Sequence, residues 1–369
     1  MNSSHDITVY ERNPEGSTYG WGVTYWYELF ENLFRADPES ARIIGERAVR
    51  WDTWFARVHE QPPVTIGYWD EGFGIGRQDL LDILTERARS LGVQVEFEHE
   101  VTDEAELSDA DLVVAGDGVG SVLRERHAGH FGTEIDVGRN MYMWLGTTKV
   151  FDAFTFAFVE TPHGWIWCYG YVYSPDNSTC VVECSPDTWK GLGLHQTNEA
   201  DSLAMLEKLF ADTLDGHALI GREHDDDSAH WLNFRTVSNR RWYRDNLVLL
   251  GDAAHTTHYS IGAGTALALG DAACLVDTLH QGSDLQTALG RYERERRAVT
   301  RMSQRAARNS ARWYANLPRY ITLPPPKMLT LLGQRHSAVL AHVPPRLYYG
   351  MGWLSSRVIR TFNRDARQR

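Results

Sequence analysis

The residues best suited to chemistry stand in one short stretch, where an apolar run, Leu247–Leu250, ends on Gly251-Asp252. Two more glycines, Gly262 and Gly264, precede a small-residue segment that is compatible with a helix. Backbone amides at a helix N-terminus favour an anionic or phosphate group, whereas a carboxylate accepts hydrogen bonds from sugar or ribityl hydroxyls. The combination predicts a nucleotide-type cofactor site at the end of a strand. For a Gly-Asp pair alone, a buried strand capped by an Asx turn would be the simpler interpretation.

A second site of the same kind follows another apolar run and contains Gly116, Asp117 and Gly118. Glycines allow a ligand to approach the backbone closely, and Ser121 can cap the helix that follows. Two strand ends of this type in one chain strengthen the interpretation as a cofactor site.

Glu11, at the end of the first expected strand, is a third candidate. In dinucleotide-binding folds a carboxylate at this place holds ribose hydroxyls, about 20 residues after a Gly-x-Gly-x-x-Gly loop. Only 10 residues precede Glu11, so we expect the first strand, the glycine loop and most of the first helix to be absent. The segment Gly72–Arg77 resembles such a loop, but it follows a polar segment and is not counted as the diphosphate site.

The composition of the 369-residue chain is that of an ordinary globular protein, with 43% hydrophobic and 23% charged residues. The four cysteines form no CxxC pair and the histidines show no metal-ligand spacing, so we expect reduced cysteines and no metal site. The N-terminus is polar, unlike a signal peptide, and no apolar run reaches the roughly 18 residues of a membrane span. We therefore expect a cytoplasmic protein without a nucleic-acid partner, and the oligomeric state stays open.

Charge is distributed unevenly along the chain. Residues 291–369 contain 17 Lys and Arg against 3 Asp and Glu, whereas the residues before them contain 20 against 46. A basic helical segment lying on an acidic body is one explanation. Contact of this segment with a phosphate-rich ligand or a membrane surface is the functional alternative.

The elements that must position these residues follow from hydrophobic periodicity and turn signals. Alternating β-branched and aromatic residues between 140 and 183, separated by turns, predict an antiparallel sheet. Elsewhere strands and helices alternate. Strands are expected near 6–13, 93–97, 110–115 and 247–250, and helices near 26–58, 78–91, 198–214, 266–276 and 291–314.

Taken in order, Glu11, Arg77, Asp117 and Gly251-Asp252 resemble the pattern of FAD-dependent aromatic hydroxylases of the para-hydroxybenzoate hydroxylase type. More narrowly, the chain resembles the branch that holds salicylyl-CoA 5-hydroxylase, anthraniloyl-CoA monooxygenase and the violacein-pathway hydroxylase. The segments that carry this narrower resemblance are residues 19–23, Gly138–Asn140, Trp144–Lys149, Val182–Ser185 and His258–Thr265.

This resemblance implies an α/β fold, α+β overall. It would consist of a Rossmann-like FAD-binding domain that lacks its first β-α unit, an inserted antiparallel-sheet substrate domain and a helical C-terminus. The expected boundaries are 1–139 with 235–290 for the FAD-binding domain, 140–234 for the substrate domain and 291–369 for the basic C-terminal segment.

The resemblance also implies roles for individual residues. Glu11 would hold the adenosine ribose, Arg77 would lie along the diphosphate or ribityl chain, and Asp117 would touch both FAD and NAD(P)H. Asp252 would bind the ribityl hydroxyls, and the amides of residues 262–265 would face the flavin N1–C2=O edge, which is negative in the reduced state. The full expected set of cofactor-binding residues is Glu11, Arg12, Trp21, Gly22, Arg77, Asp117, Gly251, Asp252, Gly262, Ala263, Gly264 and Thr265.

The expected catalytic side chain is His258, which stands between Asp252 and the flavin-facing glycines; a structural histidine is the alternative. Four aromatic residues are expected either to line the substrate pocket or to belong to the core. They are Trp144 and the alternating Trp167, Tyr169 and Tyr171, which share one face of a strand.

The implied activity is monooxygenation with NAD(P)H and O₂ through a flavin C4a-hydroperoxide. The substrate would be an electron-rich aromatic acid, its CoA thioester or an indole-type metabolite, and Arg297, Arg301 and Arg305 would offset the phosphates of a CoA thioester. The alternatives are a flavin-dependent reductase or dehydrogenase on the same scaffold and a cofactor-poor remnant without the glycine loop.

This chain departs from the pattern of closer relatives at position 270, where it has a glycine and they tend to have a glutamate.

Overall fold

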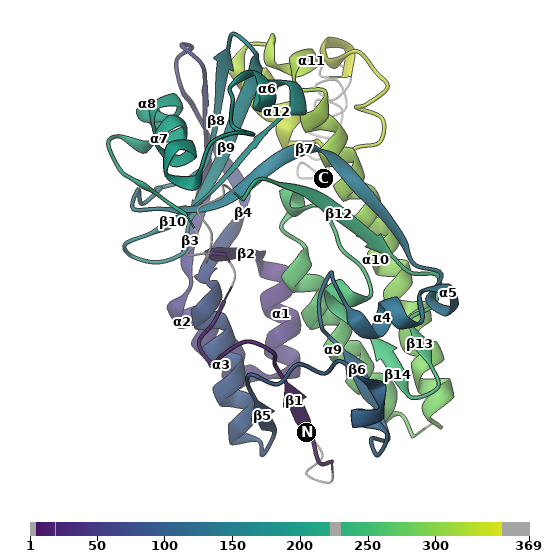
Figure 1. Cartoon of the computed structure of the whole chain (residues 1–369). Coiled ribbons are helices and arrows are strands. Elements are labelled where there is room, and N and C mark those ends of the chain that lie inside the picture. Colours follow the sequence, from purple (N-terminus) through teal and green to yellow (C-terminus); the bar gives the residue numbers. More distant parts are fainter. Residues whose placement is uncertain (1–4, 19, 222–229, 283, 349–369) are drawn as a thin grey trace, which may run out of the picture.

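A computed structural model describes residues 5–18, 20–221, 230–282 and 284–348 (Figure 1). Its largest element is a nine-stranded sheet with the strand order β11-β7-β10-β9-β8-β3-β4-β2, in which β12 also pairs with β7. The pairing is antiparallel throughout, except that β3 runs parallel to β8. The strands are β2 (Gly22–Trp26), β3 (Val49–Val58), β4 (Val64–Gly76), β7 (Glu134–Thr147), β8 (Phe154–Thr161), β9 (Gly164–Val172), β10 (Ser178–Cys184), β11 (Leu219–Ile220) and β12 (Leu232–Ser238).

Two small sheets, each with one parallel pair of strands, lie below the large sheet in Figure 1. One consists of β1 (Thr8–Tyr10) and β5 (Gln94–Glu96), and the other contains β6 (Val113–Ala115), β14 (Leu247–Leu249) and β13 (Tyr243–Arg244). Within the described residues β1 pairs only with β5 and β6 pairs only with β14, so each has one unpaired backbone edge.

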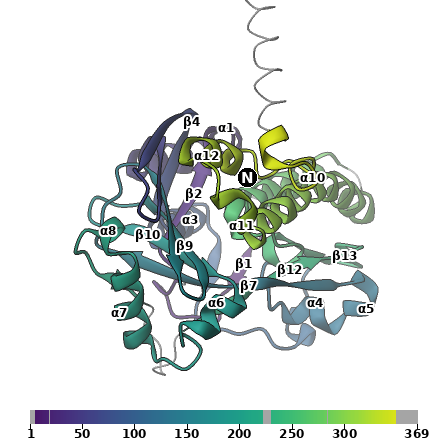
Figure 2. The same ribbon diagram turned by 90° about the horizontal axis from the view of Figure 1, so that it is seen from above.

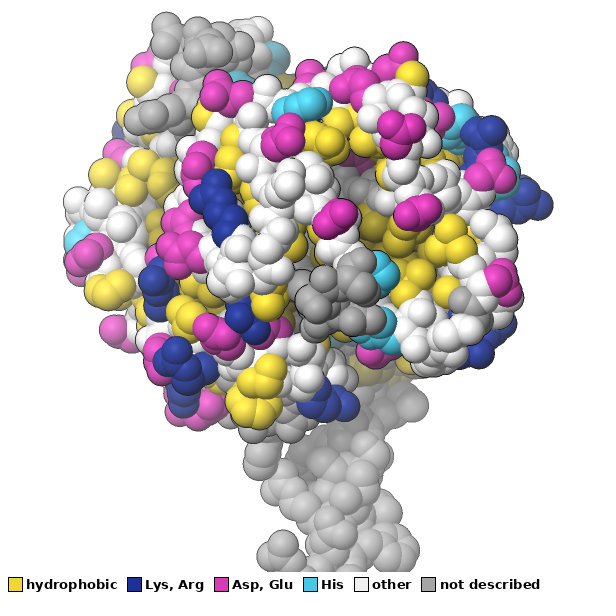
Figure 3. All heavy atoms as spheres, turned by 90° about the horizontal axis from the view of Figure 1, so that it is seen from below, with side chains coloured by type: hydrophobic (Ala, Val, Ile, Leu, Met, Phe, Trp, Pro, Cys, Tyr) yellow, Lys and Arg dark blue, Asp and Glu magenta, His cyan; other side chains and the backbone are white. Residues whose placement is uncertain are grey.

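The apolar side chains of these small sheets are unusually accessible. Val9 and Val114 are each 44% exposed, although parallel strands are normally covered on both faces. Figure 3, which views this end of the molecule from below, shows hydrophobic side chains on the walls of a hollow. The parallel pairs agree with the Rossmann-like character expected for this part of the chain.

Helices cover both the small sheets and the large one. Figures 1 and 2 show α10, α11 and α12 along one side of the large sheet, and α9 packs against α10. The helices are α1 (Tyr27–Ala36), α2 (Pro38–Arg47), α3 (Arg77–Ser90), α4 (Val122–Arg126), α5 (Ala128–Phe131), α6 (Pro186–Gly191), α7 (Glu199–Leu209), α8 (Ala211–Leu214), α9 (Gly264–His280), α10 (Leu285–Ala315), α11 (Pro318–Ile321) and α12 (Pro325–Gly333). Short 3-10 turns occur at Glu104–Leu107, Gly251–Ala253 and Tyr259–Ile261.

The two faces of the large sheet bury different side chains. On the face towards α10–α12, Trp167 and Tyr169 pack with Trp313 and Tyr314 of α10. On the other face, smaller strand residues such as Cys168 pack with residues of α7 and the segment that follows it. Strand alternation thus separates an aromatic face from an aliphatic one.

Most expected elements are confirmed, including α3, the strands between 140 and 183, and the long basic helix α10. The helix expected over 26–58 is wrong in its last part, because residues 49–58 form β3. β2, β3 and β4 also pair into the large sheet, so this sheet extends beyond the segment 140–234 expected for it. Residues 349–369 of the basic segment lie outside the described residues. Within the described part of the chain, no helix is both long and apolar enough to span a membrane.

Candidate active site

β14 carries Asp252 to the end of the small parallel sheet. Gly251 has a φ of +59°, which glycine adopts without steric cost, and the chain then forms the 3-10 turn Gly251–Ala253. The Asp252 side chain is exposed, yet enough protein surrounds it for desolvation to raise its pKa, while the charges of His255 and Arg77 oppose this shift. An accessible carboxylate near an arginine is suited to accept hydrogen bonds from ligand hydroxyls.

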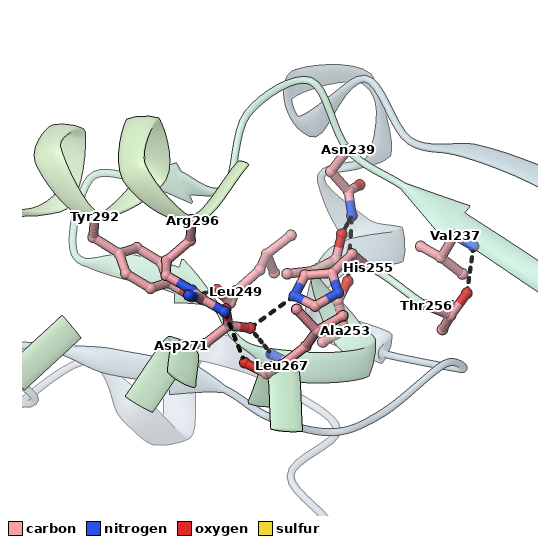
Figure 4. A network of polar contacts seen from close by, with 12 residues as sticks. Val237, Asn239, Leu249, Ala253, His255, Thr256, Leu267, Asp271, Tyr292 and Arg296 are labelled. Atoms are coloured by element: carbon pink, nitrogen blue, oxygen red, sulfur yellow. Dashed lines mark hydrogen bonds and ion pairs between the residues drawn. The ribbon is translucent and has the colours of Figure 1, made fainter. Parts of the chain in front are cut away.

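A fully buried carboxylate, Asp271 on α9, fixes the shape of this turn (Figure 4). Its Oδ2 accepts a hydrogen bond from Gly251 N at 3.1 Å and lies 2.7 Å from His255 Nε2. Its Oδ1 accepts a hydrogen bond from Arg296 Nε at 2.7 Å. Gly270 makes room for this arrangement, because a Cβ there would lie 3.0 Å from Arg296 Nη2. Asp271 therefore positions the backbone that presents Asp252.

The start of α9 offers backbone donors to a ligand. Gly262 has a φ of +61°, and its Cα faces β2 closely enough that a Cβ would lie 2.9 Å from Thr24 Oγ1. No side chain caps the first turn of the 17-residue helix. A Cβ on Gly264 would meet no atom within 4 Å, so the amides here border open space. This geometry suits a partial negative charge on a bound group.

The loop before β2 joins the same region from the other side. Arg77 N donates to Trp21 O at 2.8 Å, and Gly22 is held by Thr179 Oγ1 at 2.9 Å and by the Tyr171 hydroxyl at 2.8 Å. The glycine at position 22 is required, because a Cβ would lie 2.4 Å from Tyr173. The structure thus brings Trp21, Gly22 and Arg77 towards the end of the molecule that holds Asp252 and the start of α9.

The residues expected at the adenosine end are less well assembled. Glu11 ends β1, and its Oε1 accepts hydrogen bonds from Asn13 N and Nδ2 at 2.8 and 2.6 Å. Arg12 lies 3.8 Å from Glu100 on the surface. Asp117 follows β6 in the other small sheet and accepts a hydrogen bond from Val122 N at 2.9 Å. The described residues contain no Gly-x-Gly-x-x-Gly turn.

The four aromatic residues expected at the substrate pocket or in the core lie in different places. Trp167 and Tyr169 are buried, and Trp167 stacks on Tyr314 at 5.7 Å between ring centroids. Tyr171 is also buried and contributes through its hydroxyl contact with Gly22. Trp144 lies directly against the loop before β2, since a Cβ on Gly20 would meet its ring at 2.5 Å. Of the four, Trp144 is the aromatic side chain that borders this loop.

His258 is buried, and its Nδ1 lies 2.9 Å from Ser260 Oγ. Burial, helped by the nearby charge of Arg335, lowers the pKa of this histidine to about 3, so its ring is neutral. Ser260 Oγ continues to Ser310 Oγ at 2.7 Å, and Arg335 donates to Ser260 O at 2.6 Å. The histidine thus belongs to a chain of contacts that ties the segment before α9 to α10.

Glu183 was not expected among the functional residues, and its burial in the large sheet shifts the pKa of its carboxyl group. It is buried in β10 and accepts hydrogen bonds from Asn140 Nδ2 at 2.7 Å and from the Tyr259 hydroxyl at 2.9 Å. Desolvation raises its pKa to about 7, against the effect of these donors. Its signals in the sequence are a carboxylate within an apolar strand and its place in the segment Val182–Ser185, which carries part of the resemblance.

The donor set fits one end of FAD better than the other. The exposed carboxylate of Asp252, the neighbouring Arg77 and the uncapped start of α9 match a ribityl chain and an isoalloxazine ring. At the adenosine end, the described residues supply Glu11 and the glycines at 116, 118 and 120, where an added Cβ would meet nothing within 4 Å.

Comparison with known proteins shows the family of the chain. The FAD binding domain family matches residues 68–307. The chain is 38% identical over 328 residues to salicyloyl-CoA 5-hydroxylase from a Streptomyces species, covering 86% of the chain and 62% of that relative. It is 37% identical over 317 residues to 3-hydroxy-4-methyl-anthranilyl-[aryl-carrier protein] 5-monooxygenase from Streptosporangium sibiricum, covering 85% and 83%. Identity to protodeoxyviolaceinate monooxygenase from Chromobacterium violaceum is 31% over 315 residues, covering 84% and 82%.

Solved structures show the same fold at lower sequence identity. 2-Methyl-3-hydroxypyridine-5-carboxylic acid oxygenase superposes with a TM-score of 0.69 at 19% identity, over 85% of each chain. A probable FAD-dependent monooxygenase from Pseudomonas aeruginosa superposes with a TM-score of 0.62 at 17% identity, over 85% of this chain and 90% of that one.

Proposed function

The chain belongs to the FAD-binding-domain family of flavoprotein monooxygenases, and from this premise we propose that it hydroxylates an electron-rich aromatic ring with NAD(P)H and O₂. The observation that carries the proposal is the uncapped, open start of α9 on the same side as the exposed Asp252. Bound FAD supplies hydride uptake from NAD(P)H and the activation of O₂.

The protein's own residues hold and polarise the cofactor in this proposal. Asp252 would accept hydrogen bonds from the ribityl hydroxyls, and Arg77 would lie beside it along the cofactor. The amides of residues 262–265 would stabilise negative charge at the flavin N1–C2=O edge, because they lie at the positive end of a helix. Asp271 keeps the turn of Asp252 in place through Gly251 N.

We propose His258 as the polar group nearest the reacting face. Its neutral state and its contact with Ser260 suit a hydrogen-bonding group that orients a ligand without adding charge. Trp144, which lies against the loop before β2, would shield the reacting ring from water. Trp167 and Tyr169 lie in the core and would support this wall of the site. Exclusion of water favours transfer of oxygen to the ring over loss as peroxide.

For the substrate we propose an aromatic acid carried as a thioester. Two of the relatives named above act on such forms, one on a coenzyme A ester and the other on an aryl group on a carrier protein. The chain spans 62% of the length of the first of these. Arg297 and Arg301 lie on α10, where they are positioned to attract the phosphates of a thioester arm.

The test couples oxygen uptake to product. With NADH or NADPH and an aryl-CoA such as salicyloyl-CoA, we expect substrate-dependent O₂ consumption and a product heavier by one oxygen atom from ¹⁸O₂. Reduction of flavin with release of peroxide, and no labelled product from any aryl acid or thioester, would instead support a flavin reductase. A protein that binds no flavin would contradict both.

A further inference from the structure

A cavity lies behind the turn that carries Asp252, between α10 and the end of β12. It measures about 240 Å³, which corresponds to about eight water molecules. Its charged and polar lining includes Glu134, Arg240, Arg297, Thr300, Arg301 and Gln304. None of these residues belongs to the flavin site described above.

Thr300 gives the first sign that this cavity takes a ligand. The side chain is 2% exposed and lines the cavity, and its Oγ1 has no hydrogen-bond partner in the structure. A buried hydroxyl without a partner costs free energy. A ligand with an acceptor atom beside Thr300 would remove this cost.

The charge balance gives the second sign. Arg240 pairs with Glu134 at 2.7 Å, and Arg297 pairs with Glu293 at 3.1 Å. Arg301 also lines the cavity and forms no ion pair or hydrogen bond in the described part of the chain. The lining therefore carries one uncompensated guanidinium next to an unsatisfied hydroxyl donor, and arginine with a hydroxyl is a donor pair that favours phosphate.

The cavity wall also touches the backbone that leads from Asp252. Gln304 Nε2 donates to Thr256 O at 3.0 Å and to Val237 O at 2.9 Å. Asn239, shown with His255 in Figure 4, donates to Ala254 O at 2.6 Å. A ligand in the cavity would therefore contact side chains that hydrogen-bond to the backbone of residues 253–256, the segment after the ribityl-binding residue.

We propose that this cavity binds the phosphate group of a small molecule, through Thr300 Oγ1 and the guanidinium groups of Arg301 and Arg297. Two sources share this chemistry, free inorganic phosphate and the phosphate groups of a CoA-type ester. The coenzyme A source rests on the proposed function, which assigns Arg297 and Arg301 to a thioester arm, whereas the binding of orthophosphate stands on the contacts above.

The test measures phosphate binding directly. We expect orthophosphate to bind the purified protein saturably in calorimetry at constant ionic strength, and Thr300→Val and Arg301→Gln each to weaken it by about tenfold or more. Arg308→Gln, an exposed arginine on the same helix outside the cavity, is the matched control and should leave the Kd unchanged. Absence of saturable binding, or an equal effect of Arg308→Gln, would overturn the proposal.

A second arm separates the two sources. Coenzyme A that binds more tightly than orthophosphate, competes with it and loses affinity in the same two variants identifies the ester as the ligand. Orthophosphate binding without competition from coenzyme A identifies a free anion. Thr300→Val replaces an unsatisfied hydroxyl with a methyl group, so unfolding by urea should show an unchanged or increased stability. Hydroxylation that fails in a protein with intact phosphate binding would count against the proposed function alone.

Discussion

At the scale of single residues, Glu183 shows how strongly burial in the large sheet raises the pKa of a carboxyl group. Its pKa of about 7 results first from desolvation, which outweighs the donors Asn140 and Tyr259. In the unfolded chain the same group titrates near 4.5. Below that pH both states are protonated and the group costs nothing. As the pH rises towards 7 the unfolded state loses its proton first, so the folded state loses stability.

The first prediction follows from this sign. Glu183→Gln removes the titration, so between about pH 4 and about pH 8 wild type should lose about 3 kcal/mol of unfolding free energy relative to the variant. Urea denaturation across this range measures the difference. Glu160→Gln, an exposed glutamate on β8, is the control and should follow wild type. Parallel pH profiles for wild type and Glu183→Gln would show that the carboxyl group is not buried as described.

At the scale of elements, α9 links the cofactor turn to the long helix α10 through Asp271. Asp271→Asn leaves Arg296 without its carboxylate, and breaking a buried pair of this kind costs about 3 kcal/mol. We expect this loss in urea denaturation, and a lower FAD affinity in fluorescence titration because the turn of Asp252 loosens. Asp277→Asn, exposed on the same helix, should change neither quantity. A destabilised protein with unchanged FAD affinity would refute the positioning role.

The open start of the same helix gives a second prediction for this element. A side chain on Gly264 enters open space, so Gly264→Leu should fold with nearly unchanged stability. A flavin seated against the helix start would collide with it, and FAD affinity should fall by about tenfold or more. Gly129→Leu, also at a site with no atom within 4 Å of an added Cβ, should bind FAD as wild type does. Equal FAD affinities for Gly264→Leu and wild type would show that the flavin does not bind against the start of α9.

Local signals explain which elements and site residues could be predicted from the sequence. Gly251 and Gly262 were recognised because glycine next to a strand end or helix start has a local conformational reason, and both have positive φ. Asp271 and Glu183 were not, because their partners Arg296 and Tyr259 stand 25 and 76 residues away in the chain. β3 was taken for helix because an irregularity between Trp51 and Thr53 interrupts the alternation of buried and more accessible residues that is typical of a strand.

At the scale of the whole molecule, the two ends of the cofactor site differ in how well the chain completes them. The flavin end is built from β2 of the large sheet, the turn after β14 and the start of α9, and α9 contacts both of the other elements. The adenosine end is divided between two small sheets whose end strands, β1 and β6, do not pair with one another. Glu11 Oε1 accepts hydrogen bonds from Asn13, and Asp117 Oδ2 accepts one from Val122 N, so each carboxylate is oriented by its own loop.

This asymmetry predicts an unusual order of flavin affinities for the polypeptide of residues 1–369. Because the described residues contain no Gly-x-Gly-x-x-Gly turn for the diphosphate, the adenosine half of FAD should add little binding energy. We expect riboflavin and FAD to bind with Kd values within about tenfold of each other in fluorescence titration, and Asp252→Ala to weaken both by a similar factor. If FAD binds about a hundredfold or more tightly than riboflavin, the open backbone at Gly116, Gly118 and Gly120 must hold the diphosphate. In that case Gly118→Val should abolish the preference for FAD while riboflavin affinity stays unchanged.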